Sequence, residues 1–154
     1  MSWAEIWTRG TPRPLTDDSN LCGLIKFYQA ALGAGIKPIF GVDLQVRDDD
    51  DDGALPASVT LLARTPAGYA NLRQLISRAW LEGQLQGRAT VRREWVGEHA
   101  EGVIALSGAR HGDIGQALIK GRAERAEAAA GWWLQHFPGS FYIELQRTGR
   151  PDED

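Results

Sequence analysis

Carboxylates stand at two points where the sequence predicts the ends or the middle of strands. Asp17 and Asp18 close a short extended segment directly before an amphipathic helix, and Asp43 lies inside the extended run 36–46. Because α/β folds place their sites where strands give way to helices, these carboxylates suit a divalent cation or general acid–base chemistry. A structural role for the first pair is the alternative, since aspartate caps a following helix well, as Ser19 and Asn20 also can.

The aspartate run 48–52, followed by Gly53, invites a calcium interpretation. Asp48, Asp50, Asp52 and Gly53 align with the start of an EF-hand loop. That loop ends on a bidentate glutamate, however, and Val59 stands at the corresponding position. The flanking segments also have strand patterns, whereas an EF-hand has helices there. The pattern therefore favours a solvated, self-repelling connection.

The segment Ser107–Gly112 lies between a predicted strand and a predicted helix, a place where α/β folds bind phosphate. Its glycines match neither the P-loop nor the dinucleotide-binding spacing, which favours a tight turn that needs glycine. The histidines at 99, 111 and 136 have no zinc-like spacing to one another or to Cys22. The lone Cys22 cannot form an internal disulfide, and we expect it to pack as a small apolar residue.

Two adjacent tryptophans and three arginines are further candidates for contact surfaces. Trp132 and Trp133 point about 100° apart on a helix, so one is expected in the core and the other can mark an interface, unless both pack on a broad face. Arg88, Arg92 and Arg93 form a small basic cluster. Three arginines are weak evidence for a DNA track, and a solvated surface explains them.

The elements that position these residues alternate between helix and strand. Thr65 and Pro66 mark a clear helix start, because a capping hydroxyl precedes a proline at the first helical position. Five helical segments are predicted: 20–33, one from Pro66 that buries Leu72, Leu75, Ile76, Ala79 and Trp80, a weaker one at 92–98, 111–120 and 123–136. Strands are predicted at 36–46, 58–64, 103–106 and 141–146. This alternation predicts an α/β fold with a largely parallel sheet.

Composition narrows the class of protein. The 154 residues, 43% of them hydrophobic, suffice for one domain with a core. No apolar run approaches the ~20 residues of a membrane span, and the N-terminus lacks a secretory signal pattern. A single cysteine agrees with a reducing, cytoplasmic location. The net charge of −3 disfavours autonomous nucleic-acid binding, so any action on DNA is expected as part of something larger.

Four segments resemble the PHP (polymerase and histidinol phosphatase) domain of bacterial DNA polymerase III alpha subunits. They are LTDDSNLCGLIKFYQAALGAGIKPIFGVDLQVR (15–47), LLARTPAGYANLRQLISRAWLEG (61–83), GVIALSG (102–108) and FYIELQRTGRPDE (141–153). The resemblance makes residues 15–154 a partial PHP domain and leaves residues 1–14 as a non-matching segment. It implies a distorted β/α barrel of parallel strands with covering helices, incomplete because one strand–helix–strand unit is missing at the N-terminus.

The resemblance also implies which residues stand at the metal-binding positions of active family members. Asp18 stands where they have a histidine ligand, and Asp43 where they have an acidic ligand. Ser58 stands at a histidine position and Ala109 at a cysteine or histidine position, and neither can replace an imidazole or thiolate. The expectation is a degenerate site with Asp18 and Asp43 alone, no catalytic residue and no cofactor, although active members use divalent metal.

The function implied by the resemblance is that of a fragment of a DNA-directed DNA polymerase, a nucleotidyltransferase of DNA replication. In the family, polymerisation uses carboxylates of a separate palm domain, so no polymerase active site is expected in this chain. The PHP domain is expected to act as a structural and docking module for the rest of the holoenzyme and for the proofreading exonuclease subunit. The alternatives are a metal-dependent phosphoesterase or 3′–5′ exonuclease, which the missing histidines disfavour, and a fragment without activity.

The N-terminal segment has a pattern of its own. Trp3, Ile6 and Trp7 fall at helical spacing before Gly10 and Pro12 break the helix. Such a helix could cover the face left by the missing unit, or the segment could have no structural role. Open sheet edges and uncovered apolar faces predict marginal stability and self-association.

Overall fold

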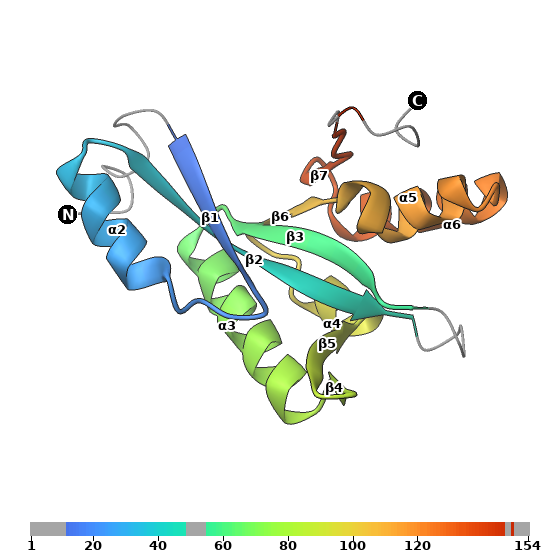
Figure 1. Cartoon of the computed structure of the whole chain (residues 1–154), viewed down its shortest axis with the longest axis horizontal. Helices are drawn as coiled ribbons and strands as arrows, with labels where there is room; N and C mark the ends of the chain where they lie inside the picture. The colour runs from blue at the N-terminus through green and yellow to red at the C-terminus, as the bar shows by residue number, and fades with distance from the viewer. Residues whose placement is uncertain (1–11, 49–54, 147–148, 150–154) are drawn as a thin grey trace.

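A long central strand organises the sheet. The computed structural model of the chain describes residues 12–48, 55–146 and 149 (Figure 1). Strand β2 (Lys37–Arg47) pairs in parallel with β1 (Pro12–Asp18) along its first part and in parallel with β5 (Arg88–Arg92) along its last part. Its other edge pairs antiparallel with β3 (Ala57–Ala63). β1 and β5 therefore follow one another along a single edge of β2.

The sheet is mixed. β6 (Val103–Leu106) pairs antiparallel with β3 and parallel with β7 (Phe141–Tyr142), while β4 (Gln84–Leu85) pairs antiparallel with β5. The α/β class is confirmed, and three of the six strand pairings in the described part of the chain are parallel. The prediction of a largely parallel sheet was wrong at β3, which pairs antiparallel with both of its neighbours. The connection of residues 48–56 before it is too short for the crossover that parallel strands require.

Helices flank the sheet at three places in Figure 1. α3 (Pro66–Leu81) packs against β2, β3, β5 and β6, and α4 (Arg93–Glu98) follows β5. α2 (Leu24–Gly33) lies along β2 at one end of the molecule. At the other end, α5 (Asp113–Ile119) packs against α6 (Ala123–His136), and a 3₁₀ turn, η1 (Ala109–His111), precedes α5.

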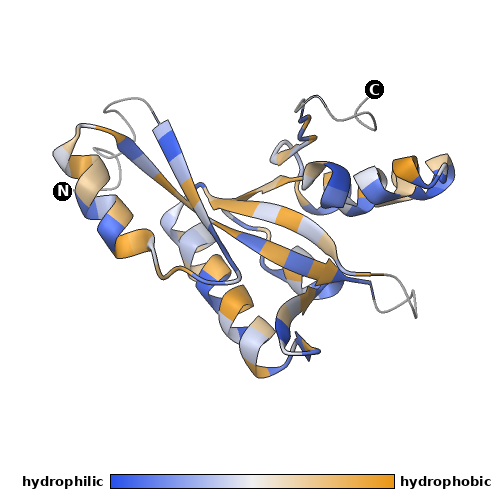
Figure 2. Cartoon of the chain, viewed as in Figure 1, coloured by the Kyte–Doolittle hydropathy of each residue, from blue (hydrophilic) through white to orange (hydrophobic). Residues whose placement is uncertain are grey.

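Part of the core lies between the sheet and α3, and the same core continues to buried residues of α4, α5 and α6. Val42, Leu44 and Val46 alternate along β2 with half-buried polar residues, so one face of the strand is fully apolar. Figure 2 shows this alternation as changes of colour along the strands. Leu72 and Leu75 of α3 are fully buried against that face. The other face of β2 carries Asp43 and Gln45 and is the polar face of the sheet.

Several predicted elements agree with the structure, and others do not. The strand 103–106 and the helix 123–136 have the predicted bounds, and α3 begins at Pro66 with Thr65 Oγ1 accepting a hydrogen bond from the Gly68 N–H at 3.1 Å. The predicted strand 141–146 ends at Tyr142. The β4–β5 hairpin was missed, although Gly87 at φ 78° marks its turn.

Two predicted burials were wrong. Trp80 is 44% exposed because its indole reaches across to the loop after β1 instead of entering the core. Cys22 is exposed because it lies in that loop, before α2 begins at Leu24. The described helices include none that is long and apolar enough to cross a membrane. Trp3, Ile6, Trp7 and the aspartates 49–52 lie outside the described residues.

Candidate functional site

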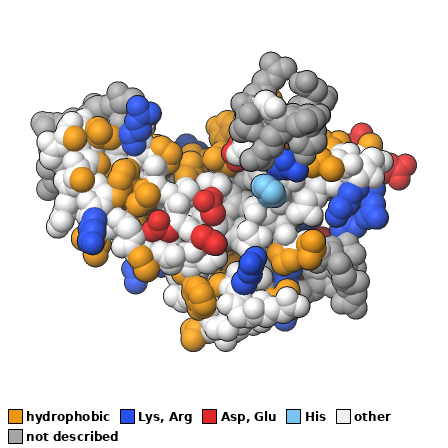
Figure 3. All heavy atoms as spheres, in the orientation of Figure 1, with side chains coloured by type: hydrophobic (Ala, Val, Ile, Leu, Met, Phe, Trp, Pro, Cys, Tyr) orange, Lys and Arg blue, Asp and Glu red, His pale blue; other side chains and the backbone are white. Residues whose placement is uncertain are grey.

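The two predicted metal residues lie side by side on the polar face of the sheet. Asp18 and Asp43 are register partners of the parallel strands β1 and β2, so their side chains leave the sheet on the same side. Asp18 is exposed and accepts a hydrogen bond from Ser19 Oγ at 3.0 Å. Asp43 is half-buried, and its Oδ1 accepts from Thr60 Oγ1 at 2.5 Å. Figure 3 shows acidic side chains gathered near the centre of the face in view.

The loop after β1 is held in place from two sides. Ser19 is buried with a left-handed φ of 56°, and its N–H donates to the Asp43 carbonyl at 2.9 Å. The indole Nε1 of Trp80 donates to the Ser19 carbonyl at 2.8 Å. Helix α3 and strand β2 thus both fix the backbone that carries Asp18, and sequence reasoning did not identify Trp80 in this role.

Asp17 has a structural role, although neither aspartate caps α2 with its side chain as was weighed for the pair. Its Oδ2 accepts a hydrogen bond from the Gly23 N–H at 2.8 Å, and Gly23 is the N-cap residue of α2. Neither Ser19 nor Asn20 caps the helix as expected, because Asn20 Oδ1 instead accepts from the Cys22 N–H at 2.8 Å within the loop. A Cβ on Gly23 would lie 3.0 Å from the Asp17 carboxylate, so this close approach favours glycine.

The other two family positions lie near the polar face without supplying ligands. Ser58 of β3 is the register partner of Gln45, and its Oγ accepts from Gln45 Nε2 at 2.9 Å. Ala109 begins η1 with a left-handed φ of 47°. Within the described residues, no three or more His, Cys, Asp or Glu side chains are grouped so as to hold a metal ion. The degenerate two-carboxylate site stays a prediction, and the structure shows only that its two residues, Asp18 and Asp43, are register partners.

The glycine-containing segment after β6 is a tight turn. Gly108 has a φ of 69°, and a Cβ on Gly112 would lie 1.7 Å from the Ser107 carbonyl oxygen. Ser107 is buried, and its Oγ accepts from the Glu144 N–H at 2.9 Å, which ties the turn to the segment after β7. The turn interpretation is therefore favoured over phosphate binding. Two histidines have local contacts as well, since His99 bonds to Trp95 O at 2.8 Å and His136 to Trp132 O at 2.9 Å.

Of the three arginines of the predicted cluster, Arg88 and Arg92 are exposed, as a solvated surface requires, whereas Arg93 is half-buried. Arg92 lies over the Trp95 ring at 5.4 Å, and Arg88 is exposed at the start of β5. Arg93, whose side chain is 15% exposed, forms an ion pair with Asp113 at 2.6 Å and a second with Asp48 at 3.5 Å. Sequence reasoning missed this polar cluster because its members come from three distant segments.

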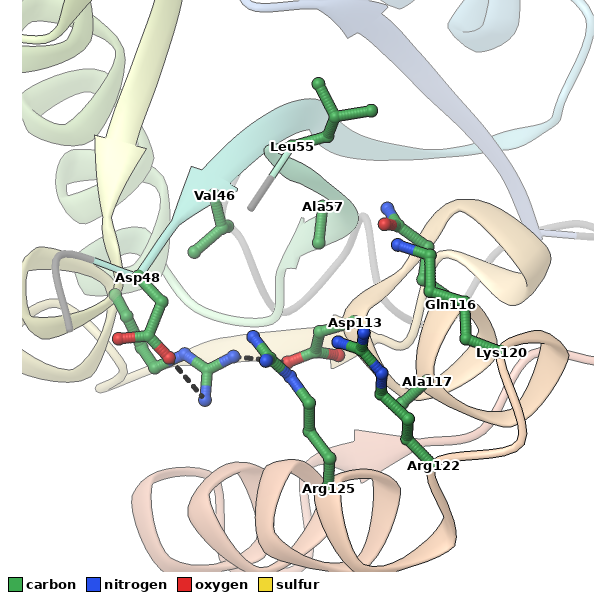
Figure 4. A pocket seen from close by; sticks show the side chains of 11 residues that line it. Val46, Asp48, Leu55, Ala57, Asp113, Gln116, Ala117, Lys120, Arg122 and Arg125 are labelled. Carbon is green, nitrogen blue, oxygen red and sulfur yellow. Dashed lines mark hydrogen bonds and ion pairs between the residues drawn. The ribbon is translucent and has the colours of Figure 1, made fainter. Parts of the chain in front are cut away.

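Asp113 is the centre of that cluster. Its Oδ2 accepts from Arg93 Nη2 and from Trp133 Nε1 at 2.9 Å, and its Oδ1 accepts from the Ile114 N–H at 2.8 Å. Trp133 is 2% exposed, which confirms that one of the two adjacent tryptophans enters the core while Trp132 is half-buried. The carboxylate thereby joins α4, α5 and α6. Asp113 also lines a pocket, together with Lys120, Arg122 and Arg125 (Figure 4).

Comparison with known proteins gives a family match and close relatives. The family model described as "PHP domain" matches residues 14–148. The chain is 49% identical over 140 residues to a protein named DNA polymerase III subunit alpha from Pseudomonas aeruginosa, 45% identical to the Vibrio cholerae protein and 44% identical to the Escherichia coli K12 protein of the same name. Each alignment covers 91% of this chain, which spans 12% of the length of these relatives.

Proposed function

Because the chain belongs to the PHP domain family, we propose that it serves as a structural and docking module of a DNA polymerase III alpha subunit. The name of the relatives supports membership of a polymerase III complex. Polymerisation of DNA is an activity of the much longer relatives. In this proposal the chain takes part in it only as one domain of an alpha subunit within the polymerase III complex.

The proposal rests on the hydrogen bonds between side chains on the polar face of the sheet. Asp43 is bound by Thr60, and Ser58 by Gln45, so the side chains facing the predicted metal position satisfy one another. Metal centres need several convergent ligands with an ordered second shell. A surface of paired hydroxyl, amide and carboxylate groups supports a scaffold role, in which rigid positioning matters more than bond cleavage.

Exposed apolar side chains at the α5 end of the molecule supply a surface for docking. Leu118 and Ile119 of α5 are each 57% exposed, and Ile143 and Leu145 after β7 are 52% and 90% exposed. With Ile114 and the β6–α5 turn they line one hollow. Exposed apolar patches of this kind mark protein contacts. The proposed partner for this surface is the proofreading exonuclease subunit of the same polymerase.

The experiment mixes the full chain with the exonuclease subunit of its own organism and measures binding by isothermal titration calorimetry. We expect a one-to-one complex that the Leu118→Gln/Ile119→Gln double variant weakens at least tenfold. The matched control is Leu81→Gln, which removes an 83% exposed leucine from α3. Absence of any complex with the wild-type chain would reject the docking proposal.

Metal titration tests whether the chain has a metal site, which the scaffold proposal does not require. With two carboxylates and no imidazole at the family positions, we expect no saturable zinc or manganese site tighter than about 10 μM at neutral pH. We also expect no metal-dependent release of nucleotides from single-stranded DNA. A stoichiometric, tight multinuclear site with hydrolysis would instead establish the phosphoesterase alternative.

A further inference from the structure

The last strand of the sheet has one open edge. In the strand order β4-β5-β2-β3-β6-β7, β7 is terminal and pairs in parallel with β6 on one side. No other strand of the described residues pairs with its second side. In Figure 1 this edge lies at the α5 end of the molecule, away from α2. The backbone N–H and C=O groups along such an edge are a template for an added strand.

β7 is short because β6 ends, and not because the residues after it disfavour a strand. The Ser107 N–H donates to the Tyr142 carbonyl at 3.0 Å, and Gly108, at φ 69°, then turns the chain away. Residues 143–146 include no glycine, proline or lysine, which are residues that weaken or block an edge strand. The strand therefore stops where its partner stops, and a new partner on the open edge would allow residues 143–146 to extend it.

The hydrogen bonds of this segment define which residues face the open edge. The Ala105 N–H donates to the Ser140 carbonyl at 2.9 Å, and the Ser107 N–H to the Tyr142 carbonyl, so these even-numbered residues direct their backbone groups toward β6. The Glu144 N–H continues the pattern by donating to Ser107 Oγ at 2.9 Å. Backbone groups alternate between the two sides of a strand. The residues that direct their backbone groups toward the open edge are therefore Phe141, Ile143 and Leu145.

The side chains of these three residues are apolar and lie on the side of the sheet that carries α5 and α6. The Phe141 ring stacks on Trp133 of α6 with 5.6 Å between the ring centroids. Ile143 and Leu145 line a hollow of about 440 Å³ together with Leu118 of α5. Exposed apolar area thus adjoins open backbone groups, and an added strand with apolar side chains would bury both.

We propose that the open edge of β7 pairs antiparallel with the same edge of a second copy of this chain, with Ile143 on the two-fold axis. In that register Phe141 lies opposite Leu145 of the second copy, and the two Ile143 residues lie opposite each other. The three residues that face the edge then form hydrogen-bonded pairs, and all their opposed side chains are apolar. On the other face Tyr142 lies opposite Glu144, so a hydroxyl donor meets a carboxylate.

The sequence of the segment favours this register and a second copy as the occupant. A shift by two residues in one direction would place Glu144 directly opposite Glu144 of the second copy, and like charges opposite each other destabilise a strand pair. A shift by two in the other direction would place Leu145 opposite Gly139, whose φ of 66° does not belong to a strand. Pairing that uses the same edge of both copies closes as a two-fold dimer. It needs no exonuclease subunit, which would compete for the same surface.

Disulfide cross-linking of the full chain tests the register. The variants Tyr142→Cys and Glu144→Cys are prepared separately, each with Cys22→Ser so that no other cysteine is present. Opposite residues of a non-hydrogen-bonded antiparallel pair have Cα atoms about 4.5 Å apart, which suits a disulfide. Under mild oxidation we expect an equimolar mixture of the two variants to form covalent dimer at least tenfold faster than either variant alone. Equal rates in the mixture and in the separate variants would overturn the proposal.

Sedimentation velocity with a proline variant tests the edge itself. Ile143→Pro removes an N–H that faces the open edge and leaves the hydrogen bonds to β6 in place. We expect the wild-type chain to shift from monomer toward dimer between about 10 and 200 μM, and Ile143→Pro to raise the dissociation constant at least tenfold. The matched control is Ile143→Val, which keeps the N–H and a β-branched apolar side chain. The cross-linking result does not depend on the folding of the proline variant.

Two sedimentation results would overturn the proposal. One is a wild-type chain that stays monomeric at about 200 μM, and the other is equal dissociation of the proline and valine variants. A monomer that binds the exonuclease subunit through residues 141–145 would assign the edge to that partner and would likewise exclude the second copy.

Discussion

Trp80 illustrates how a single exposed side chain can position a loop. Its ring is 44% exposed, yet its Nε1 is bonded to the Ser19 carbonyl, and Ser19 in turn donates to Asp43. The residue next to Asp18 therefore depends on a helix that follows it by about sixty positions. Burial alone would assign Trp80 no such role.

The variant Trp80→Phe removes the indole donor and keeps an aromatic ring. We expect the free energy of unfolding to fall by about 1 kcal/mol, because the Ser19 carbonyl loses its partner. Hydrogen exchange of the Ser19 amide should also accelerate, as the loop opens more often. Urea denaturation and exchange NMR give both quantities. Trp132→Phe is the control, and acceleration of Ser19 exchange in that variant too would contradict the assignment.

At the scale of elements, helix α3 approaches the turn before β6 backbone to backbone. A Cβ on Gly68 would lie 1.8 Å from the Gly102 carbonyl oxygen, and Gly102 has a φ of 69°. The Gly102 carbonyl also accepts from the N–H groups of Arg64 and Thr65 at 2.8 and 3.3 Å. Two glycines thus allow the capped start of α3 to lie directly on the turn that leads into β6.

Substituting alanine at two helical glycines should give effects of opposite sign. Gly68→Ala must separate α3 from Gly102, and we expect a loss of about 2–3 kcal/mol in the free energy of unfolding. Gly131→Ala, in α6, meets nothing within 4 Å, so the better helix propensity should stabilise the chain by about 0.5–1 kcal/mol. Chemical denaturation of both variants measures the difference. Stabilisation by Gly68→Ala would show that the contact with Gly102 is loose.

Local sequence rules predicted the elements that depend on neighbouring residues. Thr65 and Pro66 determine where α3 begins, and the alternation of Val42, Leu44 and Val46 determines the buried face of β2. Long-range contacts decide the rest. α2 begins at Leu24 because Asp17 bonds to Gly23 from the preceding strand, and β3 runs antiparallel because its connection is short. The first outcome depends on a contact between β1 and the start of the helix, and the second on the length of the connection, and local periodicity encodes neither.

The candidate site was predictable in part for the same reason. Family positions located Asp18 and Asp43, and the structure makes them register partners. The cluster around Asp113 was not foreseen, because Arg93 and Trp133 each lie twenty residues from Asp113 and no linear motif joins them. Their association requires α4, α5 and α6 to pack together first.

At the scale of the whole molecule, apolar side chains stay exposed at the end of the sheet near α5. Leu145 is 90% exposed and Ile143 52% exposed, beyond a strand β7 of two residues. An exposed apolar surface of this kind tends to find a partner in other molecules.

We therefore expect the isolated chain to self-associate, with an unfolding transition that is broad or depends on protein concentration. Sedimentation velocity from about 10 to 200 μM should show a rising average mass, which an Ile143→Thr/Leu145→Gln variant reduces. Ile25→Gln/Leu134→Gln is the control, since those residues are 67% and 57% exposed on other elements. A clean monomer with sharp, concentration-independent unfolding would contradict the expectation.

The branching of β2 has a consequence for how fast the chain can fold. On one edge of β2, residues 37–43 pair with β1 and residues 45–47 pair with β5, while the other edge pairs with β3. The β2–β3 pair is closest in sequence, whereas Gln45 must find Thr90 across α3. Such non-local pairings raise contact order and slow folding to milliseconds or longer. One strand with three partners thus becomes the kinetic bottleneck, since the search for its last partner sets the rate for the whole sheet.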